Sequence, residues 1–226
     1  YRLHPLLCGA ISELMYNGKL RAHPLAEQRV LSEGSGLLRA RAGLAIVDVA
    51  DDGSYRSSTS NQKEAAVVAS VVAELLERHL EDGSSSRPLS TDDILVVCPY
   101  NAHVRAVEAA LVERGIRRVR VGTVDRFQGR EAPVVVASLC APPSQNDEDE
   151  DSVASGGRGV AFVLDVRRLN VALSRAQCLA VLVAAPDLAD GAASSLDRMR
   201  ELAVLSRLRE LAVDTVVAEE SIAGEP

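Results

Sequence analysis

The sequence lacks closely spaced cysteines and long hydrophobic runs. Its four cysteines lie far apart, at Cys8, Cys98, Cys140 and Cys178. This spacing excludes a zinc ribbon and a compact disulfide scaffold, and it favours buried thiols in a reducing compartment. No apolar run approaches the roughly 20 residues of a membrane-spanning helix, and we expect no signal peptide. We therefore expect a cytoplasmic protein that has no membrane partner.

Several catalytic motifs are also missing. Neither GxxxxGKS nor GxxxxGKT occurs, because the single Gly-Lys pair, at 18–19, is followed by Leu20. The chain therefore has no phosphate-binding loop of its own. The four histidines form no HExxH or other metal-like cluster, and neither GxSxG nor a convincing Cys/His nucleophile pair is present. We expect no metal site, and we expect His103 on a helix surface rather than in the role of a base.

The chain has no initial methionine, and its net charge is concentrated in one acidic run. It begins at Tyr1, so we expect either a part of a longer protein or a gene remnant. Its 25 Lys and Arg against 32 Asp and Glu give a net charge of −7, and five of the acids lie at 147–151. The remainder is close to neutral, which is compatible with a nucleic-acid partner. The acidic run is expected to be a solvated loop, with a nucleic-acid mimic as the alternative.

Apolar residues make up 47% of the 226 residues, enough for a real core, and apolar runs alternate with helical patterns. Strands are predicted at 44–49, 93–98, 119–124, 133–139 and 178–184, and helices at 62–81, 101–113, 166–176 and about 194–213. Asn61 is predicted to cap a helix, with Glu64 completing a capping box. Continuous apolar strands are typical of a parallel sheet buried on both faces. We therefore predict an α/β fold in one domain, composed of an N-terminal segment (1–43), a core (44–192) and a helical tail (193–226).

Polar residues follow the strand predicted at 93–98. In parallel α/β sheets, ligands bind at the carboxyl ends of the strands. Pro99, Tyr100 and Asn101 come directly after this strand, and Arg105 lies one turn into the following helix. Because the free N–H groups at a helix start bind phosphate readily, this turn is a candidate phosphate site. A purely structural turn is the alternative.

The segment 121–131 is unusually polar for a connection between two apolar strands. Thr123 can hydrogen-bond a phosphate oxygen, and Glu131 can accept hydrogen bonds from a ribose hydroxyl. Phe127 is expected to anchor this loop on the core. A salt-bridged surface loop is the alternative reading of the segment.

Three arginines occur in the segment 167–176, and two of them are predicted to share a helix face. On a helix, Arg168, Ala172 and Arg175 share a face, and two guanidinium groups without intervening acids favour an anionic ligand such as a polyphosphate. A solvated basic face is the alternative. At the start of the chain, Tyr1 and Arg2 pair an aromatic ring with a cation, a combination suited to stacking on a base and binding a phosphate.

Taken together, these segments resemble the second RecA-like domain of superfamily 1 helicases of the Upf-like, 5′-to-3′ branch. Residues 1–5 and 16–20 look like that branch's YRMHP…FYxGxL stretch. The other matching segments are 61–65 (NxxEA), 94–100 (motif IV), 121–131 (motif V, DxFQGxE) and 168–176 (motif VI, RLNVAxSRA). They occur in the family's order and extend from residue 1 to about 190. The residues of these motifs are most similar to those of bacterial members. Some of those members carry a RecB-like nuclease that this chain does not show.

The resemblance implies a role for each matching residue. Arg175 would be the arginine finger on the γ-phosphate of ATP, Arg2 would be a second cation there, and Arg168 would belong to the nucleotide site. Asn61 and Glu64 would keep a helix-capping role. The remaining implied roles are Tyr1 at the adenine, Glu131 at the ribose, Gln128 between the nucleotide and strand sites, and Thr123 with Pro99, Tyr100, Asn101 and Arg105 on the nucleic-acid backbone.

The resemblance also implies partners. ATP and Mg²⁺ would be held mainly by a first RecA-like domain of the same polypeptide, and the substrate would be single-stranded DNA or RNA. The resemblance thus points to the C-terminal motor domain of an ATP-dependent helicase, and this chain alone is expected not to hydrolyse ATP. The alternative is a stand-alone nucleic-acid-binding or regulatory module without ATPase activity.

Overall fold

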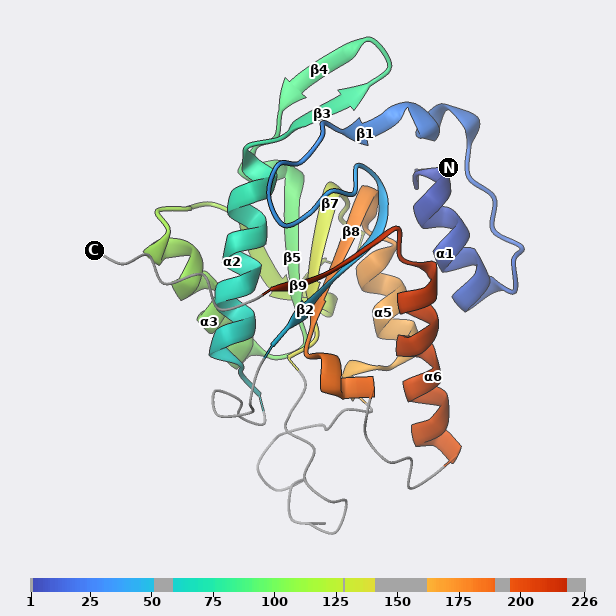
Figure 1. Cartoon of the computed structure of the whole chain (residues 1–226), viewed down its shortest axis with the longest axis vertical. Coiled ribbons are helices and arrows are strands. Elements are labelled where there is room, and N and C mark those ends of the chain that lie inside the picture. The colour runs from blue at the N-terminus through green and yellow to red at the C-terminus, as the bar shows by residue number, and fades with distance from the viewer. Residues whose placement is uncertain (1, 51–58, 128, 141–161, 190–195, 219–226) are drawn as a thin grey trace.

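The main layer of the molecule is a six-stranded, all-parallel sheet in the order β6-β5-β7-β8-β2-β9 (Figure 1). The structure, a computed structural model, describes residues 2–50, 59–127, 129–140, 162–189 and 196–218. The strands are β2 (Gly43–Val49), β5 (Ile94–Cys98), β6 (Arg120–Thr123), β7 (Ala132–Ser138), β8 (Ala176–Ala184) and β9 (Asp214–Ala218). Every residue of β2 and β5 is buried, as expected for strands covered on both faces. The predicted α/β class is confirmed.

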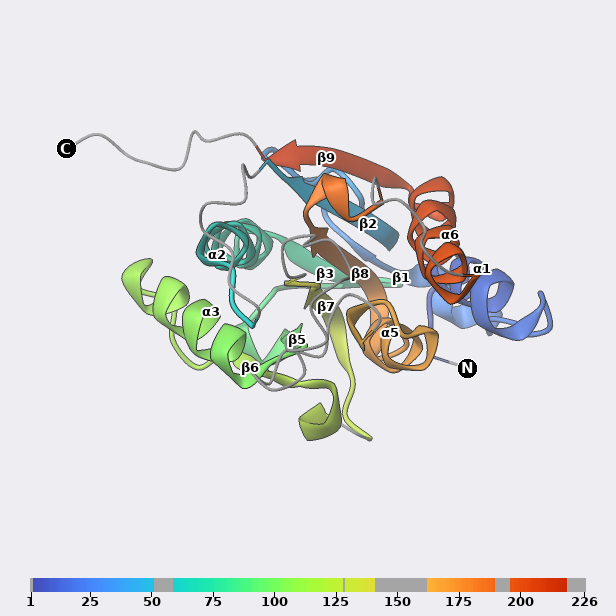
Figure 2. The same cartoon turned by 90° about the horizontal axis from the view of Figure 1, so that it is seen from below.

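Helices cover both faces of this sheet (Figure 2). One face carries α2 (Gln62–Leu76) and α3 (Asn101–Glu113), and the other carries α1 (Pro5–Tyr16), α5 (Val166–Leu173) and α6 (Leu196–Leu211). Successive side chains of a strand point to opposite faces. In β5, Val96 joins the core beneath α2 and α3, whereas Leu95 and Val97 join the core on the opposite face. Among the described residues, no helix is both long enough and apolar enough to cross a bilayer.

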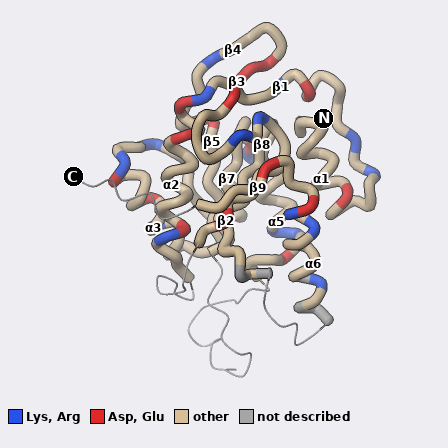
Figure 3. The backbone as a smooth tube through the Cα atoms, viewed as in Figure 1, with Lys and Arg blue, Asp and Glu red and all other residues tan. Residues whose placement is uncertain are grey.

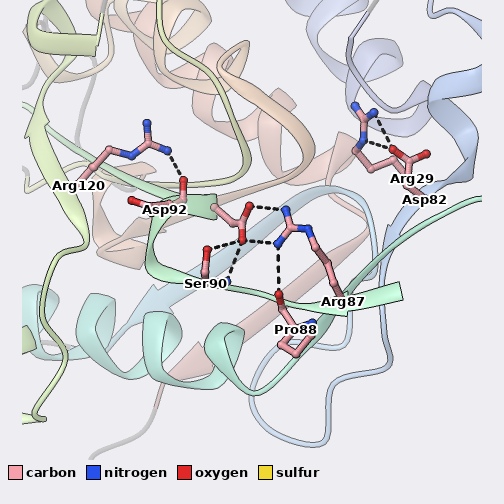
Figure 4. A network of polar contacts seen from close by, with 8 residues as sticks. Arg29, Asp82, Arg87, Pro88, Ser90, Asp92 and Arg120 are labelled. Atoms are coloured by element: carbon pink, nitrogen blue, oxygen red, sulfur yellow. Dashed lines mark hydrogen bonds and ion pairs between the residues drawn. The ribbon is translucent and has the colours of Figure 1, made fainter. Parts of the chain in front are cut away.

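A small antiparallel sheet extends the molecule beyond one end of the strands (Figure 1). It consists of β1 (Arg29–Leu31), β3 (His79–Asp82) and β4 (Ser85–Pro88), in the order β1-β3-β4. Figure 4 shows the polar contacts that attach β4 to the start of β5: the Arg87 guanidinium donates to both carboxylate oxygens of Asp93, at 2.7 and 2.6 Å. These hydrogen bonds lower the pKa of Asp93 to about 2.

One predicted helix is wrong in its extent, and one strand near the C-terminus was not predicted. The helix predicted at 62–81 ends at Leu76, because the segment 79–82 pairs with β1 instead. Arg78 stabilises the chain where it leaves α2, since its buried guanidinium donates to the carbonyls of Ser32 and Ala40. The helix predicted at about 194–213 is confirmed as α6, but the segment after it forms a strand that the sequence pattern did not indicate, β9, which pairs with β2. At its start, the Asp214 carboxylate accepts hydrogen bonds from two backbone amides of the segment 39–40.

Candidate functional site

Two candidate residues lie at the amino ends of adjacent strands. We use the name amino edge for this end of the sheet, where the parallel strands begin (upper end in Figure 1). Glu131 directly precedes β7 and Arg175 directly precedes β8. The first residues of these strands, Ala132 and Ala176, are register partners. The Ala132 N–H also donates to the Arg175 carbonyl at 3.1 Å, so the backbones that carry the two candidates are in contact.

The N-terminal segment brings Arg2 to the same edge. The His4 N–H donates to the carbonyl of Gln177 in β8 at 2.8 Å, and the His4 ring caps α1 by accepting from the Leu6 N–H. Arg2 Nη1 forms an ion pair with Glu131 Oε1 at 2.6 Å. The two side chains are 61% and 34% exposed, so this pair lies at the surface and is open to exchange with a ligand.

Within the described part of the chain, Arg175 carries a positive charge that no ion pair neutralises. Its Nε atom is buried and has no hydrogen-bond partner. The predicted common face of Arg168, Ala172 and Arg175 is wrong, because α5 ends at Leu173 with Ser174 as its C-cap. Arg175 therefore lies beyond the helix, in the turn that leads into β8.

The opposite end of the strands forms the carboxyl edge, where the other candidates gather. Cys98 and Thr123, the last residues of β5 and β6, are register partners, so Thr123 lies beside Pro99. The chain then turns at Tyr100 into α3, where the N-cap makes no side-chain capping bond to the first amides. Asn101 and Arg105, on the first turns of α3, are exposed. The structure thus brings together the residues predicted to contact nucleic acid.

Arg168 also lies at the carboxyl edge and not with Arg175. It lines a small pocket of about 30 Å³ together with Pro99, Val124 and Phe162. Its guanidinium carbon is 4.0 Å from the centroid of the Phe162 ring, which in turn stacks on Tyr100 with centroids 5.6 Å apart. Arg2, Glu131 and Arg175 lie at the other end of the strands, and the grouping of Arg168 with Arg175 is not observed.

Some predictions fall on residues that the structure does not describe. Tyr1, Gln128 and the acidic loop at 141–159 lie outside the described residues, so their roles stay predictions. Phe127 is 4% exposed and packs in the core, which confirms its predicted anchoring role. The four cysteines are free and buried, as predicted.

A buried polar network lies beneath the carboxyl edge, and sequence reasoning missed most of it. Asn61 caps α2 as predicted, because its Oδ1 accepts from the Glu64 N–H at 2.9 Å. The Glu64 side chain accepts from the Ser138 hydroxyl and the Cys140 N–H instead of the Asn61 N–H, so the predicted capping box is wrong. The Asn61 N–H donates to His103 Nδ1. Only the Asn-x-x-Glu spacing signalled this network in the sequence.

His103 is fully buried, which corrects its predicted place on a helix surface. Its Nε2 lies 2.6 Å from the Ser138 hydroxyl, whose own hydrogen is donated to Glu64. These directions place the ring proton on Nε2 and leave Nδ1 as the acceptor for Asn61. Burial lowers the pKa of His103 to about 4, and it raises the pKa values of Cys98 and Cys140. The imidazole is therefore neutral at physiological pH, with a structural role between α2, α3 and β7.

Charge over the described chain is mixed. Figure 3 shows acidic and basic positions interspersed on both sides of the sheet, so the candidate sites are set by individual cations rather than by a uniformly basic face. Among the described residues, no three His, Cys, Asp or Glu side chains gather into a group that could hold a metal ion.

Comparison with known proteins assigns the chain to a family. A model of the family described as AAA domain matches residues 1–187. DNA polymerase alpha-associated DNA helicase A of Schizosaccharomyces pombe is 32% identical over 189 residues, which are 77% of this chain and 25% of that protein. The regulator of nonsense transcripts 1 homolog of Neurospora crassa is 27% identical over 199 residues, which are 82% of this chain and 16% of that protein.

The chain thus spans a quarter or less of these two relatives. Among solved structures, the C-terminal domain of a possible DNA helicase from Lactobacillus plantarum is 16% identical, with a TM-score of 0.47 and coverage of 97% of this chain and 99% of that chain. The family match and the six-stranded parallel sheet agree with the RecA-like fold that the sequence predicted. The chain belongs to the AAA domain family, in the Upf-like branch of the superfamily 1 helicases.

Proposed function

We propose that this chain is the C-terminal motor domain of an ATP-dependent nucleic-acid helicase. In this proposal, ATP and Mg²⁺ are held mainly by a first RecA-like domain of the same polypeptide, and the amino edge of this chain faces them. The observation that carries the proposal is that Arg175 forms no ion pair within the described residues, while its carbonyl accepts from Ala132, the residue after Glu131, and Glu131 pairs with Arg2. A guanidinium without a carboxylate partner is suited to an anion supplied from outside the domain.

The amino edge would act on the triphosphate. Phosphoryl transfer depends on positioning and on neutralising the charge that develops on the transferred group. Arg175 would supply that charge as an arginine finger, with Arg2 as a second cation on the same phosphate. Glu131 would accept a hydrogen bond from the ribose once Arg2 leaves the surface ion pair to bind phosphate. Tyr1 would stack near the adenine, and Gln128 would link this site to the strand site.

The carboxyl edge would hold the nucleic acid. The first amides of α3 and the Thr123 hydroxyl are hydrogen-bond donors of the kind that contact phosphate oxygens without reading sequence. Pro99 and Tyr100 shape the turn, while Asn101 and Arg105 are exposed beside it. With the two ligands at opposite edges of one sheet, closing the amino edge onto ATP would move the bound strand together with the whole domain.

An ATPase assay tests this proposal. The full-length product of the gene that encodes this chain should hydrolyse ATP, and turnover should rise when single-stranded DNA or RNA is added. This chain alone should show no turnover, because it contains no phosphate-binding loop. A full-length product that binds a strand without any ATP turnover would contradict the motor function and favour the stand-alone binding module.

A further inference from the structure

We propose that Arg168 binds a backbone phosphate of the single strand, and that it does not belong to the nucleotide site. This inference deepens the proposed function and rests on it, since it requires that the carboxyl edge hold the strand. The geometry separates the two arginines of motif VI. Arg168 lies in the first turn of α5, where the Asp165 carboxylate accepts from its N–H, whereas Arg175 lies beyond the last turn.

Helix α5 runs antiparallel to the strands and joins the two edges. It begins near the carboxyl edge and leads directly into β8 at the amino edge. Arg175 lies seven positions after Arg168, which corresponds to about 10 Å along a helix axis at 1.5 Å per residue. The side chain of Arg168 shares its pocket with Pro99 and Val124, the residues that follow β5 and β6. Its neighbours are therefore those of the strand site.

The guanidinium of Arg168 is held in place, but within the described residues only one long ion pair offsets its charge. Its face lies over the Phe162 ring at 4.0 Å, a contact that fixes the plane of the group and leaves its in-plane N–H donors for other partners. Its ion pair with Asp125 is long, at 4.0 Å, whereas charge-assisted hydrogen bonds are about 2.7–2.9 Å. Because the Asp125 carboxylate is 83% exposed, it is hydrated and competes only weakly with a phosphate.

The surroundings of Arg168 suit contact with a single strand at the surface of the domain. Apart from Arg168, the walls of its pocket are mostly apolar and include Val97, Leu169 and Ala172. An apolar surface beside a single cation allows a sugar or base to pack against it while the neighbouring phosphate bonds to the cation. Contacts of this kind do not depend on sequence, so the ligand class is single-stranded DNA or RNA of any sequence.

Strand binding by the full-length product tests this inference. Fluorescein-labelled oligothymidine and oligouridine are titrated over a range of salt concentrations with the wild type, Arg168→Ala and Arg168→Lys. For Arg168→Ala we expect the Kd for the strand to rise about tenfold, as for loss of one charge-assisted hydrogen bond, and the salt dependence to fall by about one counterion. Arg168→Lys keeps the charge but not the planar guanidinium, so its Kd for the strand should lie between those of the wild type and Arg168→Ala.

The affinity for a non-hydrolysable ATP analogue is measured in parallel and should not change in Arg168→Ala. Arg114→Ala, an exposed arginine at the far end of α3, is the matched control and should leave both affinities unchanged. If Arg168→Ala binds the strand with unchanged affinity, whether or not it binds the nucleotide more weakly, this inference is wrong and the proposed function still stands. A wild-type protein that binds neither oligonucleotide would instead overturn the proposed function.

Discussion

At the scale of single residues, Glu64 connects three elements that are distant in the sequence. It is completely buried on the first turn of α2, and its carboxylate accepts from Ser138 and from the Cys140 N–H at the end of β7. The backbone of Cys140 adopts a positive φ of 44°, which a non-glycine residue adopts only where its surroundings enforce it. The carboxylate therefore fixes the turn that leaves β7.

Replacing Glu64 tests this role. Glu64→Ala leaves a buried hydroxyl and a buried amide without their acceptor, so we expect the free energy of unfolding to fall by about 3 kcal/mol. Urea denaturation of the chain measures the change. Glu77→Ala, which alters an exposed glutamate at the other end of the same helix, should stay within about 0.5 kcal/mol. Equal losses in the two variants would show that the network contributes nothing specific.

His103 makes stability depend on pH. Its pKa is about 4 in the folded protein and about 6.5 when unfolded, so between these values only the unfolded chain binds the proton. We expect the free energy of unfolding to fall as pH drops from 6.5 to 4, by roughly a few kcal/mol, and this contribution to level off below pH 4. Denaturation at a series of pH values should show a shallower slope for His103→Gln. An identical slope in both proteins would disprove burial of the neutral ring.

The sequence predicted some of these residues and missed others for one physical reason. Asn61 capping α2 and Phe127 anchoring its loop depend on neighbours within a few residues, so local patterns reveal them. The partners of Glu64 and His103 come from β7, which is far away in the chain. Such contacts depend on the tertiary fold and leave no periodic signal in the sequence.

At the scale of elements, the same distinction separates correct predictions from wrong ones. Helix α3 was predicted with its observed bounds because Val104, Val107 and Leu111 repeat at helical spacing. The hairpin of β3 and β4 and the strand β9 were missed, because each exists through pairing with a distant strand rather than through its own pattern. The early end of α2 follows from the same pairing.

Helix α6 offers a matched pair of arginines that tests how this element is attached. Arg209 donates two hydrogen bonds of 2.6 Å to Asp48, which lies in β2 and is only 8% exposed in its side chain. Arg207 instead pairs with Glu13 and Glu210 on the surface. Arg209→Met leaves a buried carboxylate without that cation, so we expect a loss of about 3 kcal/mol in the free energy of unfolding.

Arg207→Met should cost less than about 1 kcal/mol, because exposed ion pairs contribute little. Thermal or urea denaturation of the two variants compares them directly. If Arg207→Met proves as destabilising as Arg209→Met, the attachment of α6 does not depend on Asp48.

At the scale of the whole molecule, the parallel sheet sorts the candidate residues into two groups. Those that precede a strand, Glu131 and Arg175, lie at the amino edge, and those that follow one, such as Pro99 and Thr123, lie at the carboxyl edge. The motifs were recognisable in the sequence, but their division between two edges was not. The two groups alternate along the chain, and motif VI contributes to both through α5.

The turnover of ATP by Arg175 variants of the full-length product is the most direct test of this account. We predict that Arg175→Ala and Arg175→Lys lower kcat by a factor of about 10³–10⁵, the range attributed to arginine fingers, while strand affinity and the unfolding profile remain those of the wild type. Arg117→Ala, an exposed arginine preceding β6 at the same edge, should retain normal turnover. Wild-type turnover in Arg175→Ala would contradict the account.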